Sequence, residues 1–269
     1  MVAIENAEVP RALRSNAGAI EKAVVPLADR NIVAIGGALS KLSIGMAAQL
    51  MEYIESLSGV EKPRVLIINT ASGDDEKSKV WWMEVLLTMN SRWQVTYLTL
   101  FDQTPADLRT LILSQDIIYV GGGNTRSMLA LWQAWGIDSL LREAWERGVL
   151  LAGTGAGGMC WFKSCITDSI AGSFTPLNGL GILPFSCCLY YDVPGRREAF
   201  QRLIAAGDLP DGFGIDECAF LHFKGDQVEG IGTAYPQTGA AAHRVFKKGE
   251  VRETRMHAFP LIQLRQREA

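Results

Sequence analysis

The sequence predicts an α/β protein with a mostly parallel central sheet, helices on both faces of that sheet and an antiparallel extension. Three observations lead to this fold class. Up to about residue 170, short apolar runs alternate with amphipathic stretches, as in a parallel sheet with crossover helices. Glycine-rich turns follow three of the apolar runs. Beyond residue 170, Pro and Gly become frequent, and the apolar runs there resemble antiparallel strands.

The order of the elements follows from these patterns. Over residues 41–57 the apolar residues recur at helical spacing, which predicts a helix with one buried face. A Trp-rich helix should follow the polar loop TASGDDEKS and end near Asn90. Pro105 suits the first turn of a further helix, and Gly136 should break the helical stretch 126–147. We expect strands over 31–36, 64–69, 94–100, 116–120 and 149–153, and antiparallel strands over 219–224 and 227–233.

The composition excludes several classes of protein. With 269 residues, 48% of them apolar and 20% charged, the chain can bury a large core. A net charge of −3 argues against general nucleic-acid binding, which needs clustered positive charge. Five Cys, an odd number in a long chain, argue against a disulfide framework and indicate reduced thiols in the cytoplasm. No apolar run approaches the roughly 18 residues of a membrane helix.

The domain organisation is expected to be simple. Residues 31–269 should form a single domain, because no linker separates the two halves. Residues 1–30 resemble a helical arm that precedes this domain, and their spread of charge does not fit a signal peptide. The arm could be a lid, a dimer contact or a frayed end, and the sequence does not choose among these.

Three glycine-rich turns predict where a ligand binds. Ligands of open parallel sheets bind at the carboxyl ends of the strands. Glycine lets the backbone approach a ligand, and N–H groups at a helix start can hold an anion or an oxyanion. The turns, each after an expected strand, are Gly36-Gly37-Ala38, Gly121-Gly122-Gly123-Asn124-Thr125 and Gly153-Thr154-Gly155-Ala156-Gly157-Gly158.

The third turn fits two motifs. Gly153, Gly155 and Gly158 match the dinucleotide fingerprint G-x-G-x-x-G. That fingerprint belongs near the first strand, however, and the next acidic residue, Asp168, comes too soon. The other motif is the nucleophile elbow G-x-S-x-G, whose middle residue lies on a strained strand-to-helix turn. This elbow frame places Gly155, which has no side chain, at the nucleophile position. Nucleotide binding is therefore disfavoured.

Several segments are similar to those of a known peptidase family. Residues 118–162, with the blocks GGGNT and AGTGAGGMCWF, resemble the S51 serine peptidases, which include dipeptidase E and the cyanophycinases. The similarity continues in IVAIGGA, INTASGD, GLGILPFSCCLYYD and GIDECAFLHF, in the expected order. The resemblance implies a fold like that of the class I glutamine amidotransferases. It also implies a preference for acidic, aspartyl-like substrates.

The resemblance implies a catalytic Ser on the elbow, then an Asp and a His. On this sequence the Ser position falls on Gly155 and the His position on Tyr190, while the Asp is retained as Asp168. Gly155 can neither attack nor donate, and Tyr, with an ordinary pKa of about 10, is a poor base at neutral pH. The resemblance also implies oxyanion donors and nearby substrate contacts. The donors would be Gly122, Gly123 and Ala156, and the contacts Asn124, Thr125 and Arg126.

Other side chains could replace the missing ones. Thr154 adjoins the nucleophile position, Cys188 lies beside Tyr190, and His243 stands where the related pattern more often has Tyr. Three His and scattered Cys give no metal-ligand spacing, so we expect neither a metal nor a cofactor. Gly155 has three explanations: natural loss of the nucleophile, an engineered replacement or a misplaced frame. We favour natural loss, because an engineered replacement would more often be Ala and would leave Tyr190 unexplained.

We therefore expect a divergent family member that has lost the hydrolytic Ser–His pair but kept the pocket. It would bind an amino-acid-like or peptide-like small molecule. Asp168, Tyr190 and the oxyanion donors would then carry out cyclisation, elimination or isomerisation without an acyl-enzyme. One alternative is an inert pseudopeptidase that binds a ligand or partner, and another is an aspartyl dipeptidase that hydrolyses Asp-X bonds. We also expect a homodimer, and no nucleic-acid or membrane partner.

Overall fold

The computed structural model describes residues 22–37, 42–89, 92–261 and 263–264. The strands of its main sheet are β1 (Asn31–Ile35), β2 (Arg64–Ile68), β3 (Gln94–Leu98), β4 (Ile117–Val120), β5 (Leu150–Thr154), β10 (Ala219–Lys224), β11 (Gln227–Thr233) and β14 (Phe259–Pro260). Their order is β14-β11-β10-β1-β5-β4-β2-β3. The strands from β1 to β3 in this order are parallel, whereas β10 is antiparallel to both β1 and β11. The predicted parallel sheet with an antiparallel extension is confirmed.

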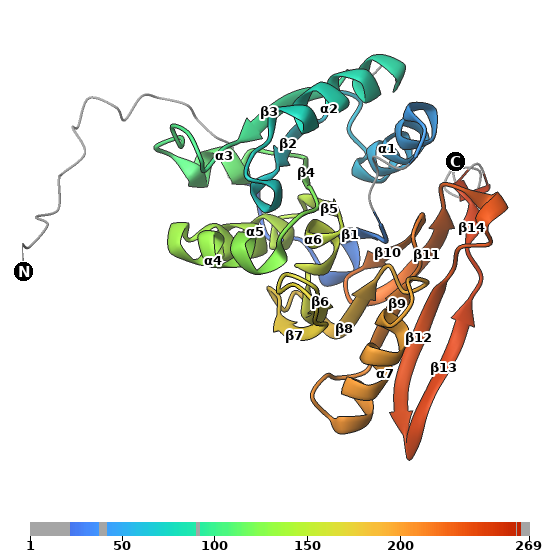
Figure 1. Ribbon diagram of the computed structural model, residues 1–269. Helices are drawn as coiled ribbons and strands as arrows, with labels where there is room; N and C mark the ends of the chain where they lie inside the picture. The colour runs from blue at the N-terminus through green and yellow to red at the C-terminus, as the bar shows by residue number, and fades with distance from the viewer. Residues whose placement is uncertain (1–21, 38–41, 90–91, 262, 265–269) are drawn as a thin grey trace, which may run out of the picture.

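Helices cover both faces of the main sheet (Figure 1). They are α1 (Ile44–Ser58), α2 (Glu76–Met89), α3 (Leu108–Leu113), α4 (Thr125–Trp135), α5 (Ile137–Glu146) and α6 (Ala156–Met159), whereas α7 (Arg196–Ala206) packs on a second sheet. On one face, strand residues such as Val33 and Ile67 share a buried cluster with α1 and α2. Their chain neighbours Ala34 and Ile68 point to the other face and share a cluster with α3, α4 and α5. The alternation of side chains along each strand produces this division.

A second sheet of six strands was not predicted as a separate sheet. It consists of β6 (Phe162–Thr167), β7 (Thr175–Asn178), β8 (Leu183–Leu189), β9 (Gly212–Ile215), β12 (Ala242–Lys248) and β13 (Glu250–Met256), in the order β13-β12-β9-β8-β6-β7. We expected one extended sheet. The single turn of α6 is too short to carry the chain back across the main sheet, so β6 begins a new sheet. Cys165 and Leu183 of this sheet join the buried cluster of α4 and α5.

The boundaries of the predicted helices agree with the structure except near Pro105, whereas α7 was not predicted. Gly136, with φ 69°, separates α4 from α5 as predicted. The helix expected from Pro105 begins only at Leu108, because Asp107 caps it and accepts a hydrogen bond from the Thr110 N–H at 2.9 Å.

The N-terminal arm predicted over residues 1–30 falls mainly outside the described residues. Its described part, residues 22–30, contains a short 3-10 turn at Leu27–Asp29 and no α-helix. The Val25 N–H donates to the Glu146 carbonyl at 2.9 Å, so this part of the arm is attached to the end of α5.

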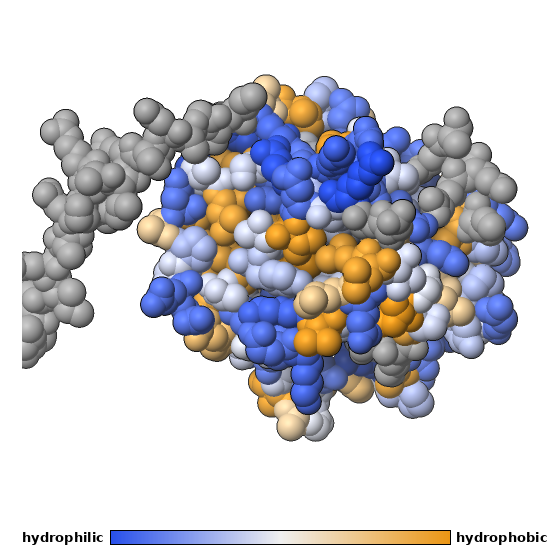
Figure 2. Space-filling view, turned by 90° about the horizontal axis from the view of Figure 1, so that it is seen from above, coloured by the Kyte–Doolittle hydropathy of each residue, from blue (hydrophilic) through white to orange (hydrophobic). Residues whose placement is uncertain are grey.

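Two properties of the surface bear on partners. Among the described residues, no helix is both long enough and apolar enough to cross a membrane. The outer face of α2 exposes Val80, Met83 and Leu87. Figure 2 looks down on the end of the molecule that is uppermost in Figure 1, where α1 and α2 lie, and shows apolar patches among charged groups.

Candidate active site

The three glycine-rich turns meet at one edge of the main sheet. β5 lies between β1 and β4, so the turns that follow these strands are neighbours. The Thr154 hydroxyl donates to the Gly37 carbonyl, which joins the first turn to the third. A Cβ on Gly122 would lie 3.4 Å from the Thr154 carbonyl oxygen, so the second turn also contacts the third. Ala38 of the first turn lies outside the described residues.

Gly155 occupies the sharp turn between β5 and α6. Its φ of 55° and ψ of −121° lie in a region that residues with a Cβ rarely adopt. The chain around it is tightly packed, since a Cβ on Gly153 would come within 2.4 Å of the Gly157 carbonyl oxygen. A Cβ on Gly157 would come within 2.1 Å of the Val120 carbonyl oxygen. This is the strained strand-to-helix turn that the elbow frame requires, and it argues against a misplaced frame.

Backbone N–H groups near the elbow are available to an oxyanion. Within the described part of the chain, the N–H groups of Gly122, Gly123 and Ala156 donate to no acceptor. The flanking N–H groups of Gly121 and Asn124 donate to backbone carbonyls at 2.9 and 2.8 Å, so the GGGNT turn is held at both ends. Fixed, unpaired donors of this kind can stabilise negative charge on a carbonyl oxygen.

A cavity of about 450 Å³ lies beside these donors. Its wall combines the glycine turn and Tyr190 with the loop after β2 and the start of α2. The sequence did not single out most of the loop residues, although the INTASGD block and the Trp pair were visible. The lining residues are Asn69, Ser72, Asp75, Lys77, Ser78, Trp81, Trp82, Tyr119, Gly121, Gly122, Gly123, Thr154 and Tyr190.

The hydroxyl of Tyr190 reaches the elbow. Its oxygen lies 3.6 Å from the position that a Cβ on Gly155 would take. Tyr190 has a φ of 56°, which is uncommon for a residue with a side chain. The guanidinium carbon of Arg196 lies 5.3 Å from the centroid of the Tyr190 ring. Burial raises the pKa of Tyr119, the second tyrosine of the cavity, well above its ordinary value. Tyr119 therefore stays protonated at neutral pH.

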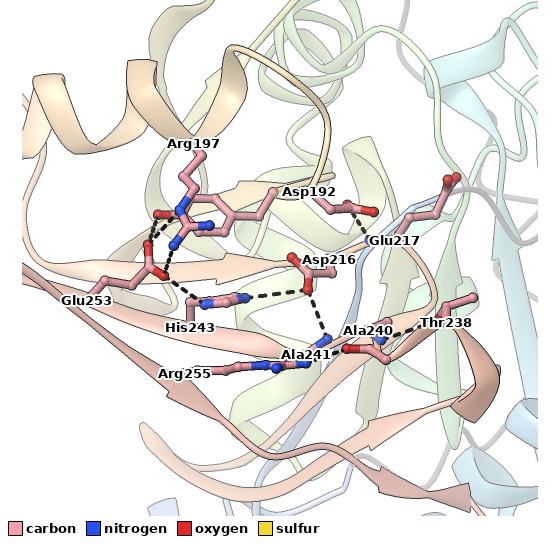
Figure 3. Close-up of polar contacts among 12 residues, drawn as sticks. Asp192, Arg197, Asp216, Glu217, Thr238, Ala240, Ala241, His243, Glu253 and Arg255 are labelled. Atoms are coloured by element: carbon pink, nitrogen blue, oxygen red, sulfur yellow. Dashed lines mark hydrogen bonds and ion pairs between the residues drawn. The ribbon is translucent and has the colours of Figure 1, made fainter.

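The turn that carries Tyr190 is anchored by its neighbours. The Tyr191 hydroxyl donates to Glu253 Oε2 at 2.6 Å. Asp192 Oδ1 accepts from the Glu217 N–H at 2.8 Å (Figure 3). Burial acts to raise the pKa of Glu253, but the hydrogen bond from Tyr191 and the adjacent positive charges outweigh it, and the pKa is lowered. An ionised Glu253 thus holds Tyr191, and with it the main chain of Tyr190.

Asp168 is paired with a residue that the sequence did not single out. Its Oδ2 accepts a hydrogen bond from Arg196 Nη2 at 2.5 Å. The Asp168 side chain is 61% exposed, whereas that of Arg196 is only 6% exposed. The same guanidinium lies over the rings of Tyr190 and Phe174. Asp168 is therefore linked to Tyr190 through Arg196.

The candidate substrate contacts after the glycine turn do not line the cavity. Asn124 Oδ1 accepts from the Ser127 N–H at 2.9 Å and so caps α4. Thr125 is buried in the first turn of α4. The Arg126 N–H donates to Ser169 Oγ at 3.2 Å, which ties α4 to the segment after β6. Roles for these residues in substrate binding stay predictions.

The side chains considered as replacement nucleophiles are engaged or buried. Thr154 lines the cavity, but its hydroxyl donates to the Gly37 carbonyl. Cys188 is fully buried, and burial raises the pKa of its thiol well above the ordinary value. Cys160 and Cys187 are also fully buried, and burial raises the pKa of each thiol well above the ordinary value. Buried neutral thiols are poor nucleophiles.

The buried histidines lie outside the cavity. His243 belongs to a polar network of the second sheet, where Nδ1 lies 3.0 Å from Glu253 Oε1 and Nε2 lies 3.4 Å from Asp216 Oδ2 (Figure 3). His222 is a structural residue, bonded to Asn31 and Tyr53. In the part of the chain that the structure describes, no group of three or more His, Cys, Asp or Glu could hold a metal ion.

A strained turn after a parallel strand, beside backbone N–H groups that donate to no described acceptor, is the backbone arrangement of a nucleophile elbow. The chain belongs to peptidase family S51, whose family model matches residues 32–231. It is 40% identical over 217 residues to the uncharacterized peptidase YgaJ of Bacillus subtilis (strain 168), covering 80% of this chain and 92% of that protein.

Two crystal structures share the fold. A peptidase from an acI-B1 Actinobacterium superimposes with a TM-score of 0.60 at 18% identity, covering 85% of this chain and 94% of that chain. A peptidase E-like protein from Listeria monocytogenes EGD-e superimposes with a TM-score of 0.55 at 18% identity, covering 76% of this chain and 98% of that chain. The fold and family expected from the sequence are confirmed.

Proposed function

We propose that this chain binds an amino-acid-like or peptide-like carbonyl compound and carries out non-hydrolytic acid–base chemistry on it, such as a cyclisation, an elimination or an isomerisation. One observation carries the proposal. The Tyr190 hydroxyl lies where it would meet a ligand at the elbow, 3.6 Å from the Cβ position of Gly155. A hydroxyl suited to proton transfer would therefore stand at the base position, beside an elbow that carries no nucleophile.

The cavity offers little to a hydrolytic mechanism. Gly155 cannot form an acyl-enzyme, and the described residues that line the cavity include no Cys and no His. The hydroxyls of Ser72, Ser78 and Thr154 each donate to another protein group. None of them is paired with a His or Lys base, and the one carboxylate partner, Asp75, also accepts from the Ser78 N–H at the start of α2.

The backbone N–H donors and the Tyr190 hydroxyl can support proton transfer to and from a ligand. The N–H groups of Gly122, Gly123 and Ala156 would stabilise the oxygen of a carbonyl group as negative charge develops on it. The Tyr190 hydroxyl would donate a proton to the ligand and take one back. A phenol is protonated at neutral pH, so it suits the role of general acid.

The test is to incubate the purified chain with dipeptides and dipeptide amides in heavy water and to follow them by mass spectrometry. We expect a product other than free amino acids, or deuterium incorporation at the α-carbon. Tyr190→Phe should slow that reaction by about a hundredfold. Tyr235→Phe is the matched control, because Tyr235 is 39% exposed and lies outside the cavity.

The other outcomes of this experiment decide between the alternatives. Ligand binding without any reaction would make the chain an inert pseudopeptidase. That alternative draws support from Asp168, whose carboxylate is held by Arg196. Hydrolysis of Asp-X dipeptides by the wild type would make it an aspartyl dipeptidase and would overturn our proposal. We also propose a cytoplasmic location, supported by five cysteines that form no disulfide with one another.

A further inference from the structure

One wall of the cavity is formed by two adjacent tryptophans of α2. Trp82 is 2% exposed, and its ring centroid lies 4.7 Å from that of Tyr119 in an edge-to-face arrangement. Trp82 therefore belongs to the core as well as to the cavity wall. Trp81 lies edge-to-face on Trp82, with 5.3 Å between centroids, and is only partly buried. Trp81 is thus the indole that a ligand can cover, and covering it would bury apolar area.

A carboxylate lies next to this aromatic wall. Asp75 lines the cavity, and its two oxygens accept from the Ser78 N–H at 2.9 Å and the Ser78 hydroxyl at 2.8 Å. Partial burial acts to raise the pKa of Asp75, but hydrogen bonds from Ser72 and Ser78 outweigh it, and the pKa is lowered. Asp75 is therefore negative at neutral pH. It favours a ligand ammonium group and disfavours a ligand side chain that carries a carboxylate.

Lys77 supplies positive charge at the same cavity. Among the described residues that line the cavity it is the one cation, and it makes no ion pair with any described residue. Its ammonium group can pair with the terminal carboxylate of a short peptide, and the described lining then holds no second cation for an aspartyl side chain. Asp75 can therefore pair with the ammonium group of a zwitterionic ligand, and Lys77 with its carboxylate.

We infer that the cavity takes an α-amino acid derivative or dipeptide whose first side chain is aromatic or bulky and apolar, and that it disfavours aspartyl ligands. The carbonyl group would lie at the glycine turn, the apolar side chain against Trp81 and the ammonium group near Asp75. This inference rests on the proposed function of the same cavity, but it concerns selection and not reaction. It departs from the acidic-substrate preference that the family resemblance implies.

The test is a calorimetric titration of the full chain with Phe-Ala and with Asp-Ala at neutral pH. Phe-Ala should bind at least about tenfold more tightly than Asp-Ala. Trp81→Leu should weaken Phe-Ala binding by about tenfold, because it removes the aromatic surface. Trp81→Phe should restore part of the loss. Met83→Leu is the matched control, since Met83 is 60% exposed and does not line the cavity.

A second variant tests the charge. Asp75→Asn keeps a good helix N-cap while removing the negative charge, so it should narrow the preference for Phe-Ala over Asp-Ala. Tighter binding of Asp-Ala to the wild type, or Phe-Ala binding that is indifferent to Trp81→Leu, would overturn the inference. Binding does not depend on turnover. Selective Phe-Ala binding without reaction would leave the inference standing and refute the proposed function, whereas a non-hydrolytic reaction on Asp-Ala alone would refute the inference and support the proposed function.

Discussion

The hydroxyl oxygen of Tyr190 lies 3.6 Å from the point where a Cβ on Gly155 would lie. The two positions that the family resemblance assigns to the nucleophile and the base are therefore still neighbours, although both side chains differ. Arg196 contacts both Tyr190 and Asp168. In a catalytic triad the carboxylate contacts the ring of the base directly. Here the Arg196 guanidinium contacts both the Asp168 carboxylate and the Tyr190 ring and replaces that direct contact.

Gly155→Ser should fold but be less stable, and it should not hydrolyse dipeptides. The new Cβ would lie 3.3 Å from Gly122 Cα, in a backbone conformation that side chains rarely adopt. We expect a loss on the order of 2 kcal/mol in the free energy of unfolding, measured by denaturant titration. Gly59→Ser is the control: φ there is 65°, but apart from the adjoining chain no atom lies within 4 Å of a Cβ, so the loss should be about 1 kcal/mol.

The double variant Gly155→Ser, Tyr190→His should hydrolyse dipeptides weakly, above the background of either single variant. It restores a hydroxyl on the elbow and an imidazole on the turn that approaches it. His also tolerates the φ of 56° at residue 190 better than most residues do. Chromatographic detection of free amino acids from Phe-Ala and Asp-Ala would measure it. Complete inertness of a well-folded double variant would contradict a retained peptidase pocket.

Arg196 should matter more for stability than its ion pair suggests. Asp168 is 61% exposed, so Asp168→Asn should cost at most about 1 kcal/mol. Arg196→Met should cost about 2 kcal/mol, because it also removes a hydrogen bond to the Leu189 carbonyl and the packing over Tyr190. Arg202→Met on the exposed side of α7 is the control. Equal losses for Arg196→Met and Arg202→Met would show that Arg196 does not hold the site.

The elements that local sequence encodes were predictable. The parallel strands and their helices follow from apolar periodicity, and the break at Gly136 follows from one glycine. The elbow was recognisable because Gly153, Gly155 and Gly157 are close in sequence, and their spacing sets the turn. The meeting of the three glycine turns also followed from the general rule for parallel sheets.

The features that depend on distant contacts were not predictable. Asp168 and Arg196 are 28 residues apart, and nothing in the sequence pairs them. The second sheet exists because β6, which follows α6, pairs with β7 and β8 and not with a strand of the main sheet. Tertiary packing decides this pairing. The local sequence around Asp75 and Trp81 predicts only an amphipathic helix and its N-cap. Only the position of α2 against the glycine turn makes it part of a cavity.

Stability should fall with acid because of His222. Burial lowers the pKa of this imidazole to about 4, from an ordinary value of 6.5. Between pH 4 and pH 6.5 the His222 imidazole is protonated in the unfolded chain but neutral in the folded chain. The contribution of His222 is therefore complete above pH 6.5 and is lost as the pH falls toward 4. Between about pH 7 and pH 5 the wild type should lose up to about 2 kcal/mol more than His222→Gln.

The control for this pH dependence is His257→Gln. His257 is exposed, so its replacement should leave the slope of stability against pH unchanged. Denaturant titrations at several pH values measure all three proteins. A His222→Gln variant with the slope of the wild type would show that the imidazole is already charged in the folded chain.

Thiol reactivity provides a direct check on the missing nucleophile. Burial raises the pKa of Cys165 to about 12 and those of Cys160, Cys187 and Cys188 well above their ordinary value. Only Cys218 is partly exposed. Iodoacetamide should therefore label Cys218 alone in the native protein and all five cysteines in denaturant, as mass spectrometry can show. Cys218→Ser should abolish native labelling. Rapid native labelling of Cys188 that also stops turnover would identify a thiol nucleophile and contradict the assignment of proton transfer to Tyr190.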